Sequence, residues 1–154
     1  MHKTTVYRRW GSKERLVAEA LEAAAESRIG APDTGDVEGD LRALARAVRA
    51  TLSGREGVAA VHALVSGARV SPEIERIARR FWATRMAQVR PIVERAIERG
   101  QLRRGTRSAE IIEHLAAPLY YRLLVGGEPP TEADAELAAA VALAAARAGV
   151  FAAD

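Results

Sequence analysis

The stretch of sequence that decides the fold is KTTVYRRWGSKERL, residues 3–16. Val6 and Trp10 are four residues apart, so on a helix they share one face and can pack together. The rest of that helix surface carries hydroxyl and basic side chains, which suit phosphate oxygens and the edges of DNA bases. The stretch therefore predicts a short helix over residues 2–9 with one packing face and one polar face.

A second helix is predicted directly after this one. Gly11 breaks the first helix, and Ser12 is a good N-cap for the next, with Glu14 in the first turn where the helix dipole favours an acid. An apolar face then continues to residue 28, and the stretch 30–35, GAPDTG, ends the helix as a linker. A phosphate at Ser12 would meet free N–H groups and the ammonium of Lys13.

Positive charge is concentrated at the start of the chain. Residues 1–15 contain five Lys or Arg and one Glu, a local net charge of +4, so the other 139 residues sum to −1 against a total of +3. Such a distribution indicates a polyanionic partner for the first residues. The alternative is an ordinary solvated run of charges.

Composition narrows the class of protein. Hydrophobic residues make up 49% of the 154 residues, enough for a real core, and no stretch approaches the ~18 consecutive apolar residues of a membrane span. The chain has no cysteine, which excludes disulfides and thiolate metal sites. We expect a cytoplasmic protein that does not cross a membrane.

The rest of the chain is predicted to be all-α. Alternation typical of strands is absent, and segments rich in Ala, Leu and Arg favour helices. Gly54 and Gly57 are expected to mark a turn, and Pro91 and Pro118 to kink the helices that contain them. Caps and apolar periodicity predict about seven helices, near 2–9, 12–28, 36–52, 58–67, 72–99, 108–124 and 131–148.

Residues 3–16 resemble the DNA-binding head of the TetR family. They match its signature at every position: a hydroxyl residue, a hydrophobe, Tyr, two polar or basic residues, an aromatic, a small residue, Ser-Lys-Glu and Leu. Weaker likeness to the family's C-terminal body lies at residues 90–102 and 115–124. The resemblance implies the remnant of a helix-turn-helix head at 1–30, with recognition and connector helices, and a ligand-binding and dimerisation domain at 36–150.

The resemblance also implies the DNA contacts. Trp10 is expected to pack rather than to touch DNA. Two helices precede the recognition helix in such a head, and none precedes His2 here, so we expect weak operator binding by this form. The alternatives for the start are a start codon assigned too late, a genuine truncation or a deliberate shortening. The expected DNA-binding residues are Lys3, Thr4, Thr5, Tyr7, Arg8 and Lys13.

A ligand pocket is expected in the body. Helices kinked by proline leave space between them, and aromatic rings with a few polar tips are typical of small-molecule sites. The alternative for each residue is ordinary helix packing. The candidates are His62, Phe81, Trp82, Arg85, Met86, His114, Tyr120 and Tyr121.

The last two helices are the expected dimer surface. Paired with a second copy they would form a four-helix bundle. The alternative is burial of their apolar residues within the chain itself. The candidates are Leu115, Leu119, Leu123, Leu137 and Val141.

Catalysis has little support in the sequence. The three histidines are far apart, none has the spacing of a metal site, and no cofactor motif is present. We therefore expect no enzyme, no metal and no cofactor. The expected function is a homodimeric transcriptional repressor that, when intact, binds operator DNA and responds to an unknown small-molecule effector. The alternative is a stand-alone helical module that binds a ligand or dimerises without binding DNA.

Overall fold

The computed structural model describes residues 30–68 and 71–152, and it is all-α over this range apart from one isolated bridge between Thr106 and Ala152. The predicted helices 2–9 and 12–28, with the six expected DNA-binding residues, lie outside the described residues. The prediction of an all-α fold is confirmed. The described helices are α3 (Val37–Ser53), α4 (Arg55–Ala68), α5 (Pro72–Glu98), α6 (Ser108–Leu124) and α7 (Glu132–Ala148).

Local capping chemistry places the starts of α5 and α7 where the sequence predicts them. Ser71 accepts a hydrogen bond from the backbone of Ile74 and precedes a proline at the first position of α5. Thr131 and Asp134 form a reciprocal capping box at α7. α6 differs, because Arg107 stands at its N-cap without a side-chain hydrogen bond.

The prolines do not divide their helices. α5 continues through Pro91 and α6 through Pro118 as single elements. Each proline removes only one backbone donor, and the neighbouring hydrogen bonds hold the helix together.

The expected turn at Gly54 and Gly57 is wrong in its second half. α4 begins at Arg55, so Gly57 lies inside the helix. A Cβ atom at Gly57 would lie 2.0 Å from the backbone oxygen of Thr51. The glycine is required by the close approach of α4 to the end of α3, a tertiary contact that a turn-based interpretation does not include.

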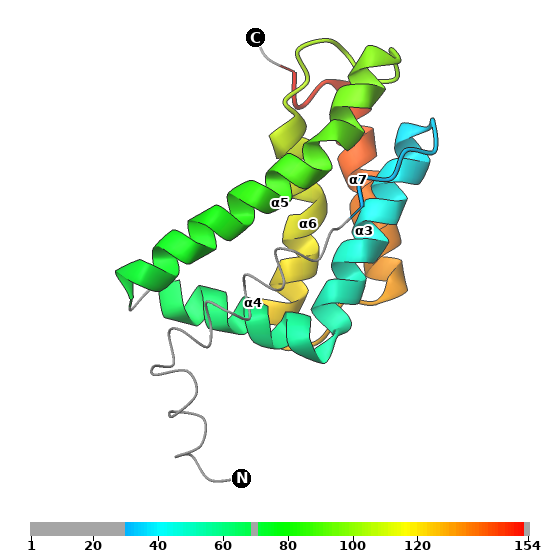
Figure 1. Cartoon of the computed structure of the whole chain (residues 1–154). Helices are drawn as coiled ribbons and strands as arrows, with labels where there is room; N and C mark the ends of the chain where they lie inside the picture. Colours follow the sequence, from blue (N-terminus) through cyan, green and yellow to red (C-terminus); the bar gives the residue numbers. More distant parts are fainter. Residues whose placement is uncertain (1–29, 69–70, 153–154) are drawn as a thin grey trace, which may run out of the picture.

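Figure 1 shows how the helices are arranged. α3 and α7 lie side by side and run in opposite directions, and α6 is antiparallel to α7. α4 crosses the lower end of the bundle, and the long α5 returns diagonally across it, packing against α4 and α6. The largest of the fully buried side chains are Leu41, Leu44, Leu52, Leu64, Ile92, Ile111, Leu115 and Leu119.

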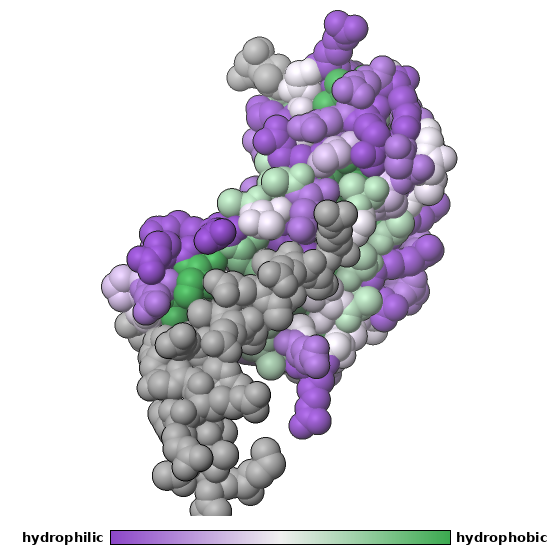
Figure 2. Space-filling view, in the orientation of Figure 1, coloured by the Kyte–Doolittle hydropathy of each residue, from purple (hydrophilic) through white to green (hydrophobic). Residues whose placement is uncertain are grey.

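Hydrophilic residues cover the upper part of the molecule in Figure 2, around the C-terminal end of α5 and the loop that follows it. A paler, more hydrophobic band crosses the middle of the same view. Ion pairs also run along the sides of the helices, between α3 and α7 and along α5.

The segment before α3 is bound to the far end of α5. Arg95 donates to the carbonyl of Pro32 at 2.7 Å and pairs with the carboxylate of Asp33 at 3.3 Å. Arg99 also pairs with Asp33, and the amide of Gln101 donates to the carbonyl of Gly35 at 2.8 Å. We call residues 32–35 with these three partners the linker anchor.

Hydrogen bonds within this segment also fix the start of α3. Asp36 is the N-cap and accepts from the backbone of Gly39 at 2.9 Å. Asp40 is buried, and its Oδ1 accepts from both the backbone N–H and the hydroxyl of Thr34, each at 2.8 Å. The linker is therefore a defined structure rather than a loose connection.

Candidate ligand-binding site

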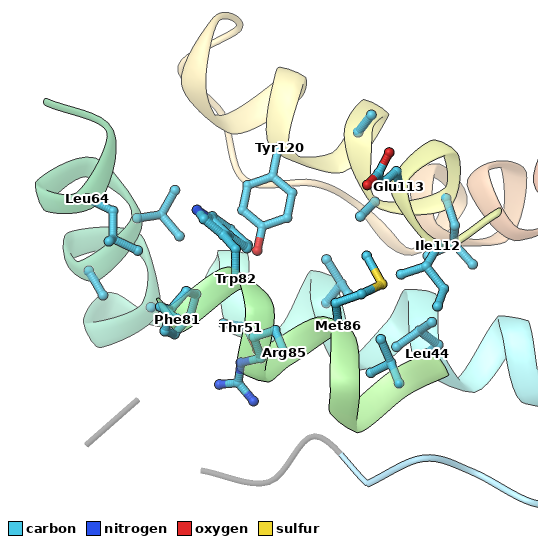
Figure 3. Close-up of a pocket in the computed structure, with 18 residues that line it drawn as sticks. Leu44, Thr51, Leu64, Phe81, Trp82, Arg85, Met86, Ile112, Glu113 and Tyr120 are labelled. Carbon is cyan, nitrogen blue, oxygen red and sulfur yellow. The ribbon is translucent and has the colours of Figure 1, made fainter. Parts of the chain in front are cut away.

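A cavity of about 430 Å³ lies between four helices, α3, α4, α5 and α6. Its volume falls in the range of about 300–1,000 Å³ that is typical of small-molecule pockets. Figure 3 shows the lining side chains converging on this space from all four helices. Most of the lining residues are apolar. The full lining is Leu44, Val48, Thr51, Gly57, Ala60, Val61, Leu64, Phe81, Trp82, Arg85, Met86, Val89, Ile112, Glu113, Leu115, Ala116, Ala117 and Tyr120.

Three aromatic rings form one wall of the cavity. Phe81 and Trp82 pack edge to face, with ring centroids 5.0 Å apart and planes at 80°. Trp82 on α5 then packs in the same way against Tyr120 on α6, at 5.4 Å and 75°. Such edge-to-face contacts are favourable beyond the burial of area. They hold α5 and α6 together on one side of the cavity.

Tyr120 supplies the polar group of this aromatic wall. Burial raises the pKa of its hydroxyl to about 12, while the nearby charge of Arg85 acts in the opposite direction. The hydroxyl is therefore neutral over the physiological pH range and can donate a hydrogen bond. In Figure 3 it points into the cavity beside Trp82.

Arg85 and Thr51 already have protein partners. The guanidinium of Arg85 lies 5.3 Å from the ring centroid of Phe81 and donates to Gln88 at 3.2 Å. Burial lowers its pKa from the ordinary value. The hydroxyl of Thr51 donates to the carbonyl of Ala47 at 3.0 Å. Neither group is a free donor inside the cavity.

Five of the eight expected ligand-binding residues line this cavity: Phe81, Trp82, Arg85, Met86 and Tyr120. The other three do not. His62 and Tyr121 are exposed, and His114 packs against Phe151 with its Nδ1 2.8 Å from the carbonyl of Glu110. Tyr121 follows Tyr120 by one position, and about 100° of helical rotation turns it away from the cavity.

The contributions of α3 and α4 were not predicted. Leu44, Val48, Val61 and Leu64 look like ordinary core residues in the sequence, because periodicity indicates the buried face but not the space that it borders. Gly57 carried the available signal. A glycine inside an otherwise apolar helical pattern suggests a close backbone approach.

The expected dimer residues separate into two groups. Leu115, Leu119 and Leu123 are buried in the chain's own core, as the alternative of internal burial expects. Leu137 and Val141 on α7 are exposed at 64% and 59%. Tyr121 on α6 and Val125, the residue directly after this helix, are exposed as well.

The described ranges are residues 30–68 and 71–152. No cluster of three or more His, Asp or Glu residues in them could hold a metal ion. Within the same residues, every helix is too short or too polar to span a bilayer.

The geometry defines a class of protein, an all-helical domain folded around an apolar cavity of small-molecule size. Residues 31–142 match the family model described as Tetracyclin repressor-like, C-terminal domain. The chain therefore belongs to the TetR family, as the resemblance of its sequence implied.

Two curated relatives and one solved structure extend this assignment. The chain is 28% identical over 126 residues to the uncharacterized HTH-type transcriptional regulator YdeS of Bacillus subtilis, covering 82% of this chain and 64% of the relative. It is 30% identical over 128 residues to the HTH-type transcriptional regulator AqdR of Rhodococcus erythropolis, covering 82% and 61%.

The crystal structure of the TetR family transcription regulator SCO0332 superposes with a TM-score of 0.75 at 30% identity. It covers 94% of this chain and 80% of that one. This chain thus spans a little over three fifths of the length of the two curated relatives.

Proposed function

We propose that this protein is a TetR-type transcriptional regulator that binds a small-molecule effector in the cavity between α3, α4, α5 and α6. The observation that carries the proposal is the cavity itself, on which five predicted ligand residues converge. Effector binding lowers the affinity for operator DNA, so the protein acts as a repressor. The names of the relatives as HTH-type regulators support a binding role rather than catalysis.

α5 is the proposed link between the effector and the DNA. Its residues 81–89 line the cavity, and Arg95 and Arg99 near its end hold Asp33 in the linker anchor. The linker follows the segment that carries the proposed DNA-binding residues. A ligand that favours one position of α5 would thereby favour one position of the linker, which is the coupling between two sites that allostery requires.

A second copy of the chain is the proposed partner of α6 and α7. The exposed hydrophobic residues here are Tyr121 on α6, Val125 directly after α6, and Leu137 and Val141 on α7. Two antiparallel helices from each copy would bury them in a four-helix bundle. The twofold axis would place two recognition helices about one DNA turn apart, as a palindromic operator needs.

The proposal is tested by DNA binding with and without an effector. A small-molecule library is first screened for compounds that raise Tm, because a ligand of the folded state stabilises it by mass action. Gel shifts then measure binding to the DNA upstream of the protein's own gene at several salt concentrations. We expect a steep loss of affinity with salt, and a further loss when a stabilising compound is added.

Two results would contradict the proposal. If the protein shifts the DNA and no stabilising compound changes that shift, the proposed response to an effector is contradicted. The absence of any shift, with a normal dimer by size-exclusion chromatography, would favour the stand-alone ligand-binding or dimerisation module.

A further inference from the structure

We propose that the cavity selects an uncharged, mainly apolar molecule that accepts one hydrogen bond from the Tyr120 hydroxyl. This ligand class rests on the ligand-binding role proposed above and specifies its chemistry. Four of the lining residues carry a hydroxyl or a charge, Trp82 adds an indole N–H, and the others are apolar residues or glycine. The polar members of the wall therefore decide what else the ligand must carry.

Three of the four polar residues are not free donors within the cavity. Thr51 donates its hydroxyl hydrogen to the carbonyl of Ala47 at 3.0 Å. Arg85 packs over Phe81 and donates to Gln88, and in Figure 3 its guanidinium points away from Tyr120. Glu113 is exposed, and a carboxylate offers no donor.

Tyr120 differs from these three residues. Its ring is held edge to face against Trp82 at 5.4 Å, so the direction of the hydroxyl is fixed. Figure 3 shows the hydroxyl directed into the cavity, and among the residues that the structure describes it makes no hydrogen bond to another protein group. A ligand carbonyl or ether oxygen placed there could accept a hydrogen bond from this hydroxyl.

The surroundings of Tyr120 also disfavour a charged ligand. Burial raises the pKa of its hydroxyl to about 12 and lowers the pKa of Arg85, and both directions mean that the charged form is poorly solvated there. An anionic ligand would lose its hydration on entering and would gain no free cation in return. The cavity thus favours a neutral molecule of one or two rings.

Three related probes test this class on the full chain by equilibrium dialysis. Benzophenone carries one carbonyl acceptor, diphenylmethane has the same shape without it, and 4-benzoylbenzoate adds a carboxylate. We expect Tyr120→Phe to weaken benzophenone binding about 3–10-fold and to change diphenylmethane binding less than about twofold, as the loss of one hydrogen bond predicts. We expect 4-benzoylbenzoate to bind about tenfold more weakly than benzophenone.

Tyr121→Phe is the matched control, since Tyr121 is the adjacent residue and lies outside the cavity. It should leave the binding of all three probes unchanged. The proposal is overturned if Tyr120→Phe weakens both neutral probes equally, because the ring alone would then matter. It is also overturned if none of the probes binds, or if 4-benzoylbenzoate binds best and loses that advantage in Arg85→Gln.

The dialysis does not depend on DNA binding. Tyr120-dependent binding of benzophenone, together with gel shifts that no cavity ligand changes, would contradict the regulatory role and leave the ligand class standing. An effector that releases DNA but binds as an anion would contradict the ligand class and leave the regulatory role standing.

Discussion

Gly57 shows how one residue fixes the position of a helix. It lies in the first turn of α4, where the backbone of α3 passes so closely that no side chain fits. Because α4 supplies one wall of the cavity, this contact also sets the shape of the proposed binding site.

Gly57→Ala should therefore destabilise the protein. Its Cβ atom would lie 2.0 Å from the Thr51 oxygen, and relief of the clash requires a backbone shift costing about 1–3 kcal/mol. Gly30→Ala is the control, since nothing lies within 4 Å of a Cβ there. Urea denaturation measures both variants, and equal stabilities would contradict the account of the contact.

Leu119 and Leu137 test the division between core and surface. Leu119 is fully buried in the chain, so Leu119→Ala should cost about 2–5 kcal/mol of unfolding free energy. Leu137 is exposed, and Leu137→Ala should change the stability of the monomer by less than about 0.5 kcal/mol. Denaturation at low protein concentration separates the two, and a large loss from Leu137→Ala would contradict its exposure.

At the scale of elements, local signals predicted the helices better than the contacts between them. Ser71-Pro72 and Thr131 act within one turn of chain, so the starts of α5 and α7 could be predicted from the sequence. α6 and α7 carry apolar residues on more than one face, and periodicity cannot tell a face that packs internally from one that meets a partner. The sequence therefore predicts both Leu115 and Leu137 as dimer residues, although only Leu137 is exposed.

The candidate site was predictable only in part for the same reason. Aromatic residues at helical spacing on α5 and α6, together with Arg85 and Met86, indicate five of the wall residues. The wall residues that α3 and α4 contribute depend on how the four helices cross. The sequence pattern of a single helix does not predict how that helix crosses the others.

The linker anchor should respond to pH. The hydrogen bond from Arg99, opposed by burial and assisted by the charges of Arg95 and Arg99, lowers the pKa of Asp33 below its ordinary value of 3.8. A carboxyl with a lowered folded pKa stabilises the native state above pH 3.8, and this contribution is lost as the pH falls through the folded pKa.

The difference in stability between the wild type and Asp33→Asn should accordingly be largest near neutral pH and vanish in strong acid. Hydrogen exchange at residues 32–37 and denaturation at each pH measure it. A difference that is constant with pH would show that the anchor does not depend on the charge of Asp33.

At the scale of the whole molecule, the exposed apolar faces of α6 and α7 predict the oligomeric state. Leu137→Glu combined with Val141→Glu should convert a dimer to a monomer, because the buried bundle would then contain unpaired charges. Ala59→Glu on α4 is the control, an exposed alanine outside this face. Sedimentation velocity distinguishes the species, and a double variant that stays dimeric would place the interface elsewhere.

The cavity between α3, α4, α5 and α6 is the proposed binding site, and filling it tests this role most directly. Ala60 lines the cavity, whereas its neighbour Ala59 is exposed on the same helix outside it. Equilibrium dialysis measures benzophenone binding to the wild type, Ala60→Phe and Ala59→Phe. The new ring of Ala60→Phe would occupy the cavity, whereas Ala59→Phe leaves it open. We predict that Ala59→Phe binds as the wild type does and that Ala60→Phe loses affinity by about tenfold or more. Equal binding by all three proteins would contradict the claim.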